Sequence, residues 1–280
     1  MRRPRALRRG RLGERLATFA LLAVGLVLTV FPLCWLVSTA FKHPVDAFAI
    51  PPTWIFEPTL DNFAKLLSGP FLATYWNSVI LTVTSTATSL VLGIPAGFAL
   101  SRLEFRARRP VAGYLLVVRM APPVVFIIPL FAAYLATGLV DSFLGLTLSY
   151  LTFTLPFVAW LMSGYFADLQ NEIWDAAHVD GCSNFGALRH VALPIALPGI
   201  ATVTILVAIM SFEQYFFPLI LGGATTTPAT VSVISFIGVE NLSWSQMAAA
   251  GVLLVAPVFV LSVVGQRGLI RGLTAGAVRG

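Results

Sequence analysis

Six long apolar runs dominate the sequence, and each is long enough to cross a lipid bilayer. They cover residues 16–40, 75–101, 111–136, 143–167, 198–221 and 247–266. A transmembrane helix needs about 20 mostly apolar residues. Only 11% of the residues are charged, whereas about a quarter are charged in a soluble domain. We therefore expect an all-α membrane protein with six transmembrane helices.

The basic residues predict how these helices are oriented. With the amino terminus inside, fifteen of the 18 Lys and Arg residues fall on the cytoplasmic side, Lys42 and Lys65 fall outside, and Arg119 lies within a span. Because cytoplasmic loops are enriched in Lys and Arg, both termini are expected in the cytoplasm. The basic residues lie at the ends of spans and form no single patch, so the net charge of +6 does not indicate nucleic-acid binding. The first run exceeds the length of about 7–15 residues typical of a signal peptide and is expected to remain as a helix.

We divide the chain into four parts. These are a basic amino-terminal segment (1–15), the first helix with its outer loop (16–71), a core of five helices (72–266) and a carboxy-terminal tail (267–280). The first helix of the core contains a series of hydroxyl residues, Thr82, Thr84, Ser85, Thr86, Thr88 and Ser89. Such residues favour close contact between helices, so this helix is expected inside the bundle. The outer segment 41–73 is rich in proline and aromatic residues, which either anchor the helices at the interface or contribute to a docking surface for an external partner.

The segment between residues 168 and 198 is the only long loop expected on the cytoplasmic side. Its first part, Glu172 to Val179, has the spacing of a short helix with Ile173, Ala176 and Ala177 on one face. Gly181 then supplies the backbone freedom that a tight turn needs.

A second short helix is expected after this turn. Ser183 is suited to cap its first turn, and Pro194 and Pro198 are expected to end it. Its apolar face consists of Phe185, Leu188 and Val191. The two helices and their turn are predicted to form a knob below the membrane.

The residues of this knob favour a protein partner. Ala176 and Ala177 allow another surface to approach closely, and Asp175 offers it a carboxylate. A helix that lies flat on lipid headgroups normally displays several Lys or Arg residues. Here the charged residues are Glu172, Asp175, Asp180 and Arg189.

The spacing of the loop resembles a known motif. Asp175-Ala176-Ala177, three residues, Gly181, nine residues and Val191-Ala192-Leu193-Pro194 resemble the EAA motif of type I ABC importer permeases. Asp175 stands where Glu is usual, and Val191 where Ile is usual. Asn77-Ser78, the run from Arg119 to Pro123 and the tail from Gln266 to Gly280 resemble carbohydrate-type permeases similar to the smaller permease subunit of the maltose transporter.

This resemblance implies a fold, a role and a set of partners. The chain would be one of two permease subunits, in a heterodimer, in the plasma (inner) membrane of a bacterium. A cytoplasmic ATPase dimer would bind ATP and Mg, so this chain would carry no cofactor and would not be an enzyme. An extracytoplasmic solute-binding protein would deliver the solute. The sequence contains no GxxxxGK[ST] phosphate loop, in keeping with a separate ATPase. The residues implied in ATPase coupling are Asp175, Ala176, Ala177, Gly181, Ser183, Leu193 and Pro194.

Two charges, Arg119 and Glu213, lie within predicted spans. Intramembrane charges usually face a bundle interior or a water-filled path. They either contribute to the solute path or form a structural ion pair with each other or with a partner chain. The candidate residues of the translocation path are Asn77, Arg119, Glu213, Gln214 and Tyr215. His43, His178 and His190 do not cluster in the sequence, and Cys34 and Cys182 lie in different environments, so neither a metal site nor a disulfide is expected.

These observations predict a permease for a sugar, an oligosaccharide or a related polyol. A non-sugar solute such as a glycerol phosphate ester is an alternative within the same family. A stand-alone secondary transporter would favour internal repeats and discontinuous helices with paired ionisable groups. No clear repeat between the halves is evident, and the cytoplasmic knob would have no purpose in such a protein. An integral-membrane enzyme would need a catalytic cluster, and none is recognisable.

Overall fold

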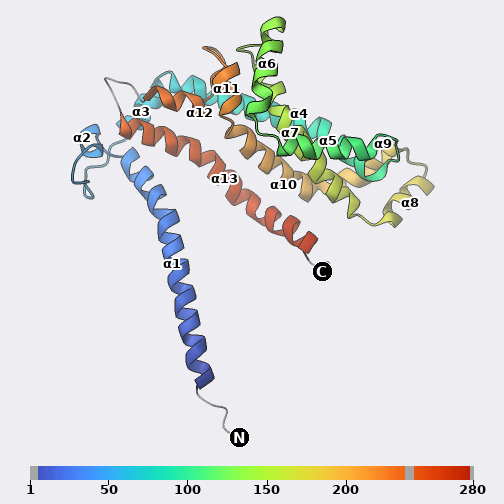
Figure 1. Cartoon of the computed structure of the whole chain (residues 1–280), viewed down its shortest axis with the longest axis horizontal. Coiled ribbons are helices and arrows are strands. Elements are labelled where there is room, and N and C mark those ends of the chain that lie inside the picture. Colours follow the sequence, from blue (N-terminus) through green and yellow to red (C-terminus); the bar gives the residue numbers. More distant parts are fainter. Residues whose placement is uncertain (1–5, 237–242, 278–280) are drawn as a thin grey trace. The chain divides into compact units, whose positions relative to one another are not determined.

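The computed structural model describes the backbone of residues 6–236 and 243–277, and the side-chain environments of residues 17–236 and 243–266. Within these ranges the regular structure is helical (Figure 1). The longer helices are α1 (Ala6–Ala40), α4 (Phe71–Arg102), α5 (Arg108–Met120), α6 (Val124–Thr137), α7 (Phe143–Ala167), α10 (Leu193–Phe212) and α13 (Trp244–Ala277). The shorter ones are α2 (Pro44–Ala47), α3 (Asp61–Ser68), α8 (Asn171–Val179), α9 (Asn184–Ala187), the π-helix η1 (Leu188–Ala192), α11 (Phe216–Leu221), α12 (Ala229–Ser232) and the 3₁₀-helix η2 (Val233–Phe236).

Five of the described helical segments are long and apolar enough to span a membrane. They are Ala17–Ala40, Phe71–Arg102, Phe143–Ala167, Asn184–Phe212 and Trp244–Gln266. A sixth is obtained only if α5 and α6 are counted as one span, although they meet at an angle of 101°. Figure 1 shows this sharp change of direction between the two helices.

The predicted third span, 111–136, is therefore not a continuous helix. Ala121 has φ −72° and ψ 133°, the extended conformation expected before a proline. Pro122 and Pro123 follow it, and a proline inside a helix removes a backbone donor and clashes with the preceding turn.

The predicted fifth span, 198–221, is also interrupted, because α10 ends at Phe212 and α11 begins at Phe216. Pro218 has no N–H group to donate to the carbonyl of Gln214, which would be its partner in a continuous helix. The Gln214 carbonyl instead accepts a hydrogen bond of 2.8 Å from the Thr230 hydroxyl. Glu213 consequently lies at a helix end and not inside a helix.

The chain forms two compact units, one of residues 1–68 and 235–253 and the other of residues 69–234 and 254–280. In the first unit, the proline- and aromatic-rich segment folds onto the end of α1. The buried Lys42 donates from Nζ to the Thr53 carbonyl at 2.8 Å, and its ammonium group lies 4.4 Å from the centre of the Trp35 ring. Trp54 packs edge-on against Trp35 with ring centres 5.2 Å apart.

The second unit is built on the contact between α4 and α7, the most extensive contact between two helices in the described chain. The Ser89 hydroxyl donates to the Thr154 hydroxyl at 2.6 Å, and the hydroxyls of Thr84 and Thr147 are 3.0 Å apart. The expectation that the hydroxyl-rich helix lies inside the bundle is confirmed, although Thr84 itself is exposed. The buried hydroxyl residues of α4 are Ser78, Thr82, Ser85, Thr86 and Ser89.

Glycines permit the close approach of α4 to α7. A Cβ atom on Gly97 would lie 2.8 Å from the Ala159 carbonyl oxygen and 2.9 Å from the Ser163 nitrogen. A Cβ atom on Gly93 would lie 2.7 Å from Val158. Because the nearest atoms to Gly97 are mainly backbone, a larger residue there must separate the helices.

We therefore expect Gly97→Val to destabilise the protein by about 1–3 kcal/mol, the usual cost of overpacking. Reversible unfolding of the protein in mixed micelles would measure this change. Gly113→Val is the matched control, because no atom lies within 4 Å of a Cβ placed on Gly113. Equal stability of the Gly97→Val and Gly113→Val proteins would contradict the tight contact.

Candidate functional site

The helix α8 presents one face to its own chain and the other to solvent. Trp174 and Ala177 are buried against the core formed by α4, α7 and α10, and the rings of Trp174 and Phe98 are 5.5 Å apart. Asp175, Ala176 and Val179 are exposed, Val179 to 87%. The expectation that Ala176 and Ala177 share one face for a partner is wrong, because Ala177 is buried in the same core as Phe98 and Trp174, whereas Ala176 is exposed.

The turn after α8 is fixed by Gly181. Its φ of +82° lies in the left-handed region, where glycine is favoured. The Cys182 N–H donates to the Ala177 carbonyl at 2.9 Å, and the Gly181 N–H donates to the His178 carbonyl at 3.0 Å. This pair of bonds is a Schellman motif, which satisfies the last carbonyls of a helix. The predicted break at Gly181 is confirmed.

The predicted cap at Ser183 is also confirmed, since its Oγ accepts a hydrogen bond of 3.2 Å from the Gly186 N–H. Leu188 is buried and Val191 half-buried, as expected, but Phe185 is 69% exposed. Phe185 was assigned to the apolar inner face, yet at the first turn of the short α9 it extends beyond the core.

The expectation that Pro194 and Pro198 end the second helix is wrong. The segment Asn184–Phe212 continues as one helical stretch through α9, η1 and α10. Pro194 is the second residue of α10 and Pro198 lies further inside it, so both prolines are within the continuous stretch. The wider π-turn of Leu188–Ala192 comes directly before Pro194, where the helical partner of its missing N–H would lie. Leu193 is half-buried and Pro194 is exposed.

His178 joins α8 to α9, a role that was not predicted from the sequence. Its Nδ1 lies 2.7 Å from the Trp174 carbonyl and its Nε2 lies 3.1 Å from Asn184 Oδ1. Both oxygens are acceptors, and together with the nearby Asp175 they raise the pKa of His178 above its usual value. The charged imidazole can donate to both partners at once.

A second set of polar contacts lies at the ends of α4 and α7 that are remote from α8. Asn77 donates from Nδ2 to the carbonyls of Thr225 and Thr227, both at 3.0 Å. Asn77 therefore holds the loop between α11 and α12. This amide nitrogen is already engaged in two hydrogen bonds, and the role of Asn77 in the solute path stays a prediction.

Asp141 holds the same loop and was not identified from the sequence. It has a positive φ of 53° and precedes α7. Its carboxylate accepts hydrogen bonds from the backbone N–H groups of Thr225 and Thr226 at 3.2 and 3.0 Å, and from the Thr226 hydroxyl at 2.7 Å. Burial by itself raises the pKa of Asp141, but these hydrogen bonds outweigh it and leave the pKa below its usual value.

Arg119 and Glu213 each lie beside a helix break. The Arg119 guanidinium lies 4.3 Å from the centre of the Trp160 ring and 5.0 Å from that of Phe157. Glu213 is exposed at the end of α10, and Gln214 and Tyr215 complete the interruption before α11. No ion pair or hydrogen bond joins Arg119 to this segment within residues 17–236, so the alternative of an internal Arg119–Glu213 pair has no support there. Nor do the described residues contain a group of three or more metal-ligating side chains.

Comparison with known proteins identifies the family. Residues 89–274 match the family described as binding-protein-dependent transport system inner membrane component. The chain belongs to this family. The permease is thus a membrane-embedded transport subunit of an ABC importer and is not itself catalytic.

Two curated relatives match it over nearly their whole length. The trehalose transport system permease protein SugB of Mycobacterium tuberculosis is 32% identical over 278 residues, which cover 96% of this chain and 100% of that protein. The diacetylchitobiose uptake system permease protein DasC of Streptomyces coelicolor is 33% identical over 267 residues, which cover 94% and 95%. In addition, a chain of a bacterial ABC transporter that imports the acidic polysaccharide alginate shares the fold, with a TM-score of 0.79, 22% identity and coverage of 95% and 99%.

The contacts of Asp141 predict a loss of stability in Asp141→Asn and a change in its pH dependence. The pKa of Asp141 is lowered in the folded protein, so the ionised carboxylate contributes to the free energy of unfolding. This contribution is complete above the usual pKa of 3.8 and is lost as the pH falls through the lower pKa of the folded state. At neutral pH, Asp141→Asn should cost about 1–2 kcal/mol, because an amide presents only one acceptor oxygen to three donors. Unfolding measured at pH 7 and below pH 4 should show a smaller difference between wild type and variant at the lower pH. Glu57→Gln is the control, because the Glu57 side chain is exposed and lacks these contacts. A difference in stability between wild type and Asp141→Asn that does not change with pH would contradict the assignment.

Proposed function

We propose that this permease forms half of the path for a sugar, an oligosaccharide or a related polyol in a bacterial ABC importer, and that it is driven through α8. A second permease chain completes the path in a heterodimer. A separate cytoplasmic ATPase dimer binds ATP and Mg, and an extracytoplasmic binding protein delivers the solute. The sugar assignment rests on the relatives, whose names specify trehalose and diacetylchitobiose.

The single observation that carries the coupling role is the two-sided character of α8. Its inner face, with Trp174 and Ala177, belongs to the same core as α4, α7 and α10. Its outer face exposes Asp175, Ala176 and Val179, and Phe185 extends the apolar area from α9. A force on the outer face therefore acts directly on the membrane helices. Gly181 and Ser183 set the turn that holds this face outward, and Leu193 and Pro194 lead it into α10.

The orientation follows from the charges. The loop that contains α8, both termini and the segment between α4 and α5 are on the cytoplasmic side, where the positive-inside rule favours the many arginines. The segments 41–73 and 222–246 are on the outer side, where the binding protein docks. This orientation puts the exposed face of α8 in the compartment that contains ATP.

The two helix breaks support the candidate solute path. Irregular backbone at membrane depth is tolerated where it is buried in protein or lines a water-filled cavity. Arg119 precedes the break at Ala121–Pro123, and Glu213 to Tyr215 form the other break. In transporters, such discontinuous helices commonly surround the solute. We assign Arg119, Glu213, Gln214 and Tyr215 to this path.

Reconstitution of the permease with its partner permease, ATPase and binding protein tests the function. We expect ATP hydrolysis to be stimulated by a loaded binding protein and to accompany sugar uptake into proteoliposomes. Trehalose and diacetylchitobiose are suitable first solutes. Uptake by this chain without an ATPase would refute the assignment and favour a secondary transporter.

Asp175→Lys tests the coupling surface. The change reverses a charge on the exposed face of α8 without touching the buried Trp174 and Ala177. We expect the ATPase to co-purify less and uptake to fall by about tenfold, equivalent to about 1.4 kcal/mol of binding energy. Glu57→Lys reverses an exposed charge in the segment after α1, which we assign to the outer side, and should leave ATPase co-purification unchanged. Normal ATPase association of the Asp175→Lys complex would remove Asp175 from the contact.

Glu213→Gln tests the path, because it removes the charge while keeping the size of the side chain. Glu213 is exposed and makes no ion pair within the described residues, so the fold should tolerate the change. We expect solute uptake to fall several-fold in a complex that assembles normally. Unchanged uptake would exclude Glu213 from the path.

A further inference from the structure

Arg102 is the last residue of α4. Its guanidinium contacts the last turn of α7, the connection that follows and the first residue of α8. Nε donates to the Phe166 carbonyl at 3.0 Å, and Nη2 donates to the carbonyls of Phe166 and Leu169. Nη1 donates to Asn171 Oδ1 at 2.6 Å. Asn171 is the first residue of α8, so one side chain connects the end of α4 to the end of α7 and to the start of α8.

The face of the same guanidinium is also occupied. Its central carbon lies 4.7 Å from the centre of the Trp174 ring, one turn further along α8. Trp174 packs against Phe98, one turn before Arg102 on α4. Arg102 therefore contacts α8 both at its first residue and on its inner face.

Only arginine can make this set of contacts. The last carbonyls of a helix have no partner within the helix and carry partial negative charge, and here the cation at the end of α4 supplies both donors and charge to α7. A planar guanidinium offers donors along its edge while its face stacks on an aromatic ring. A lysine in its place would keep the charge but not the geometry.

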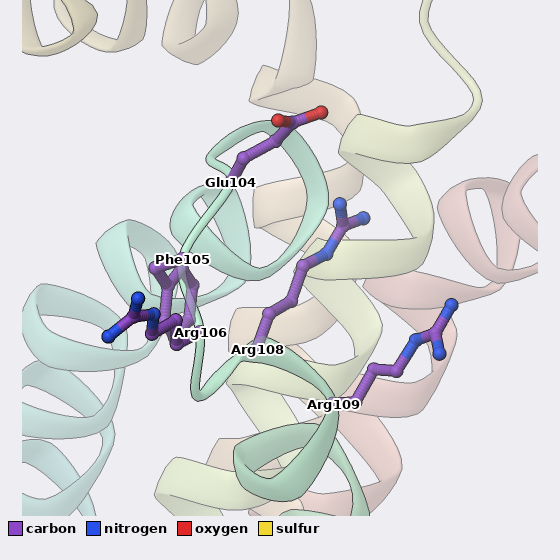
Figure 2. A pocket seen from close by; sticks show the side chains of 5 residues that line it. All are labelled: Glu104, Phe105, Arg106, Arg108 and Arg109. Atoms are coloured by element: carbon purple, nitrogen blue, oxygen red, sulfur yellow. The ribbon is translucent and has the colours of Figure 1, made fainter.

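A general preference for positive charge on the cytoplasmic side does not explain these contacts. Arg106, four residues further on, is exposed and forms no hydrogen bond or ion pair with the described residues. Figure 2 shows its side chain directed away from those of Arg108 and Arg109. All three arginines line an open hollow of about 430 Å³, together with Glu104 and Phe105. Arg108 instead donates to the carbonyls of Leu100 and Ser101 at 2.7 and 3.1 Å and so fixes the start of α5 to α4.

We propose that Arg102 is a positioning residue that fixes the coupling helix α8 to the α4–α7 pair, so that movement of α8 is passed to these two membrane helices. This inference rests on the proposed function of α8. The pair itself is closely packed at Gly93 and Gly97, so a displacement of its end moves both helices together. In this proposal Arg102 acts through α8, because the residues that we assign to the ATPase contact lie on the face of α8 away from Trp174.

The test uses the complete reconstituted importer with Arg102→Gln, Arg102→Lys and, as matched control, Arg106→Gln. We expect the Arg102→Gln complex to bind its ATPase and hydrolyse ATP, but the ATP consumed per solute imported should rise by about fivefold, within the usual range for coupling between sites. Arg102→Lys should give an intermediate ratio, and Arg106→Gln the ratio of the wild type. A normal ratio in Arg102→Gln, or an equal rise in Arg106→Gln, would overturn the proposal.

A distance measurement separates this inference from the proposed function and remains informative for a variant that transports poorly. Spin labels at Val179→Cys and Glu104→Cys, both exposed positions, report the separation of α8 from the end of α4 once Cys34 and Cys182 are replaced by Ser. The distribution should be narrow with Arg102 and broad with Arg102→Gln. Asn171→Ala, which removes a single partner, should give a smaller broadening. Equal distributions would overturn the proposal, whereas a wild-type complex without solute-stimulated hydrolysis would refute only the proposed function.

Discussion

The close contact between α4 and α7 is the interaction on which the rest of the structure depends. In a bilayer, apolar side chains gain little from leaving lipid, so helices associate through tight packing and interhelical hydrogen bonds. Gly93 and Gly97 permit that packing, and the hydroxyl pair of Ser89 and Thr154 adds a polar contact within it. The core of α8, α9 and α10 is assembled on this pair. At the end of the pair remote from α8, Asn77 and Asp141 hold the loop between α11 and α12.

The sequence predicted where apolar segments begin and end better than it predicted their direction. Hydropathy measures how readily residues transfer from water to lipid. It therefore does not distinguish a straight helix from two helices of the same composition that meet at an angle. The breaks depend on local backbone chemistry at Pro122, Pro123 and Pro218, to which hydropathy is insensitive. Conversely, Pro198 is accommodated inside α10, as prolines within transmembrane helices commonly are.

Within the candidate coupling site, features determined by neighbouring residues were predicted and those determined by distant packing were not. The positive φ at Gly181 and the cap at Ser183 follow from local geometry and were expected. Which alanine of the motif faces outward depends on how α8 packs against α4, α7 and α10, and this cannot be deduced from the spacing within the loop. The roles of Arg102 and Asp141 were missed for the same reason, because their partners are more than sixty residues away in the sequence.

The continuous stretch from Asn184 to Phe212 has a mechanical consequence. Its 29 residues form a rod about 43 Å long at 1.5 Å per residue. One end adjoins the exposed face of α8, and the other ends beside Glu213. A tilt of about 10° about the Gly181 turn would displace the far end by about 7 Å, which is wider than a water molecule and comparable to a sugar ring. Under the proposed function, a small rotation of α8 is thereby amplified, by length alone, into a displacement of several ångströms beside Glu213.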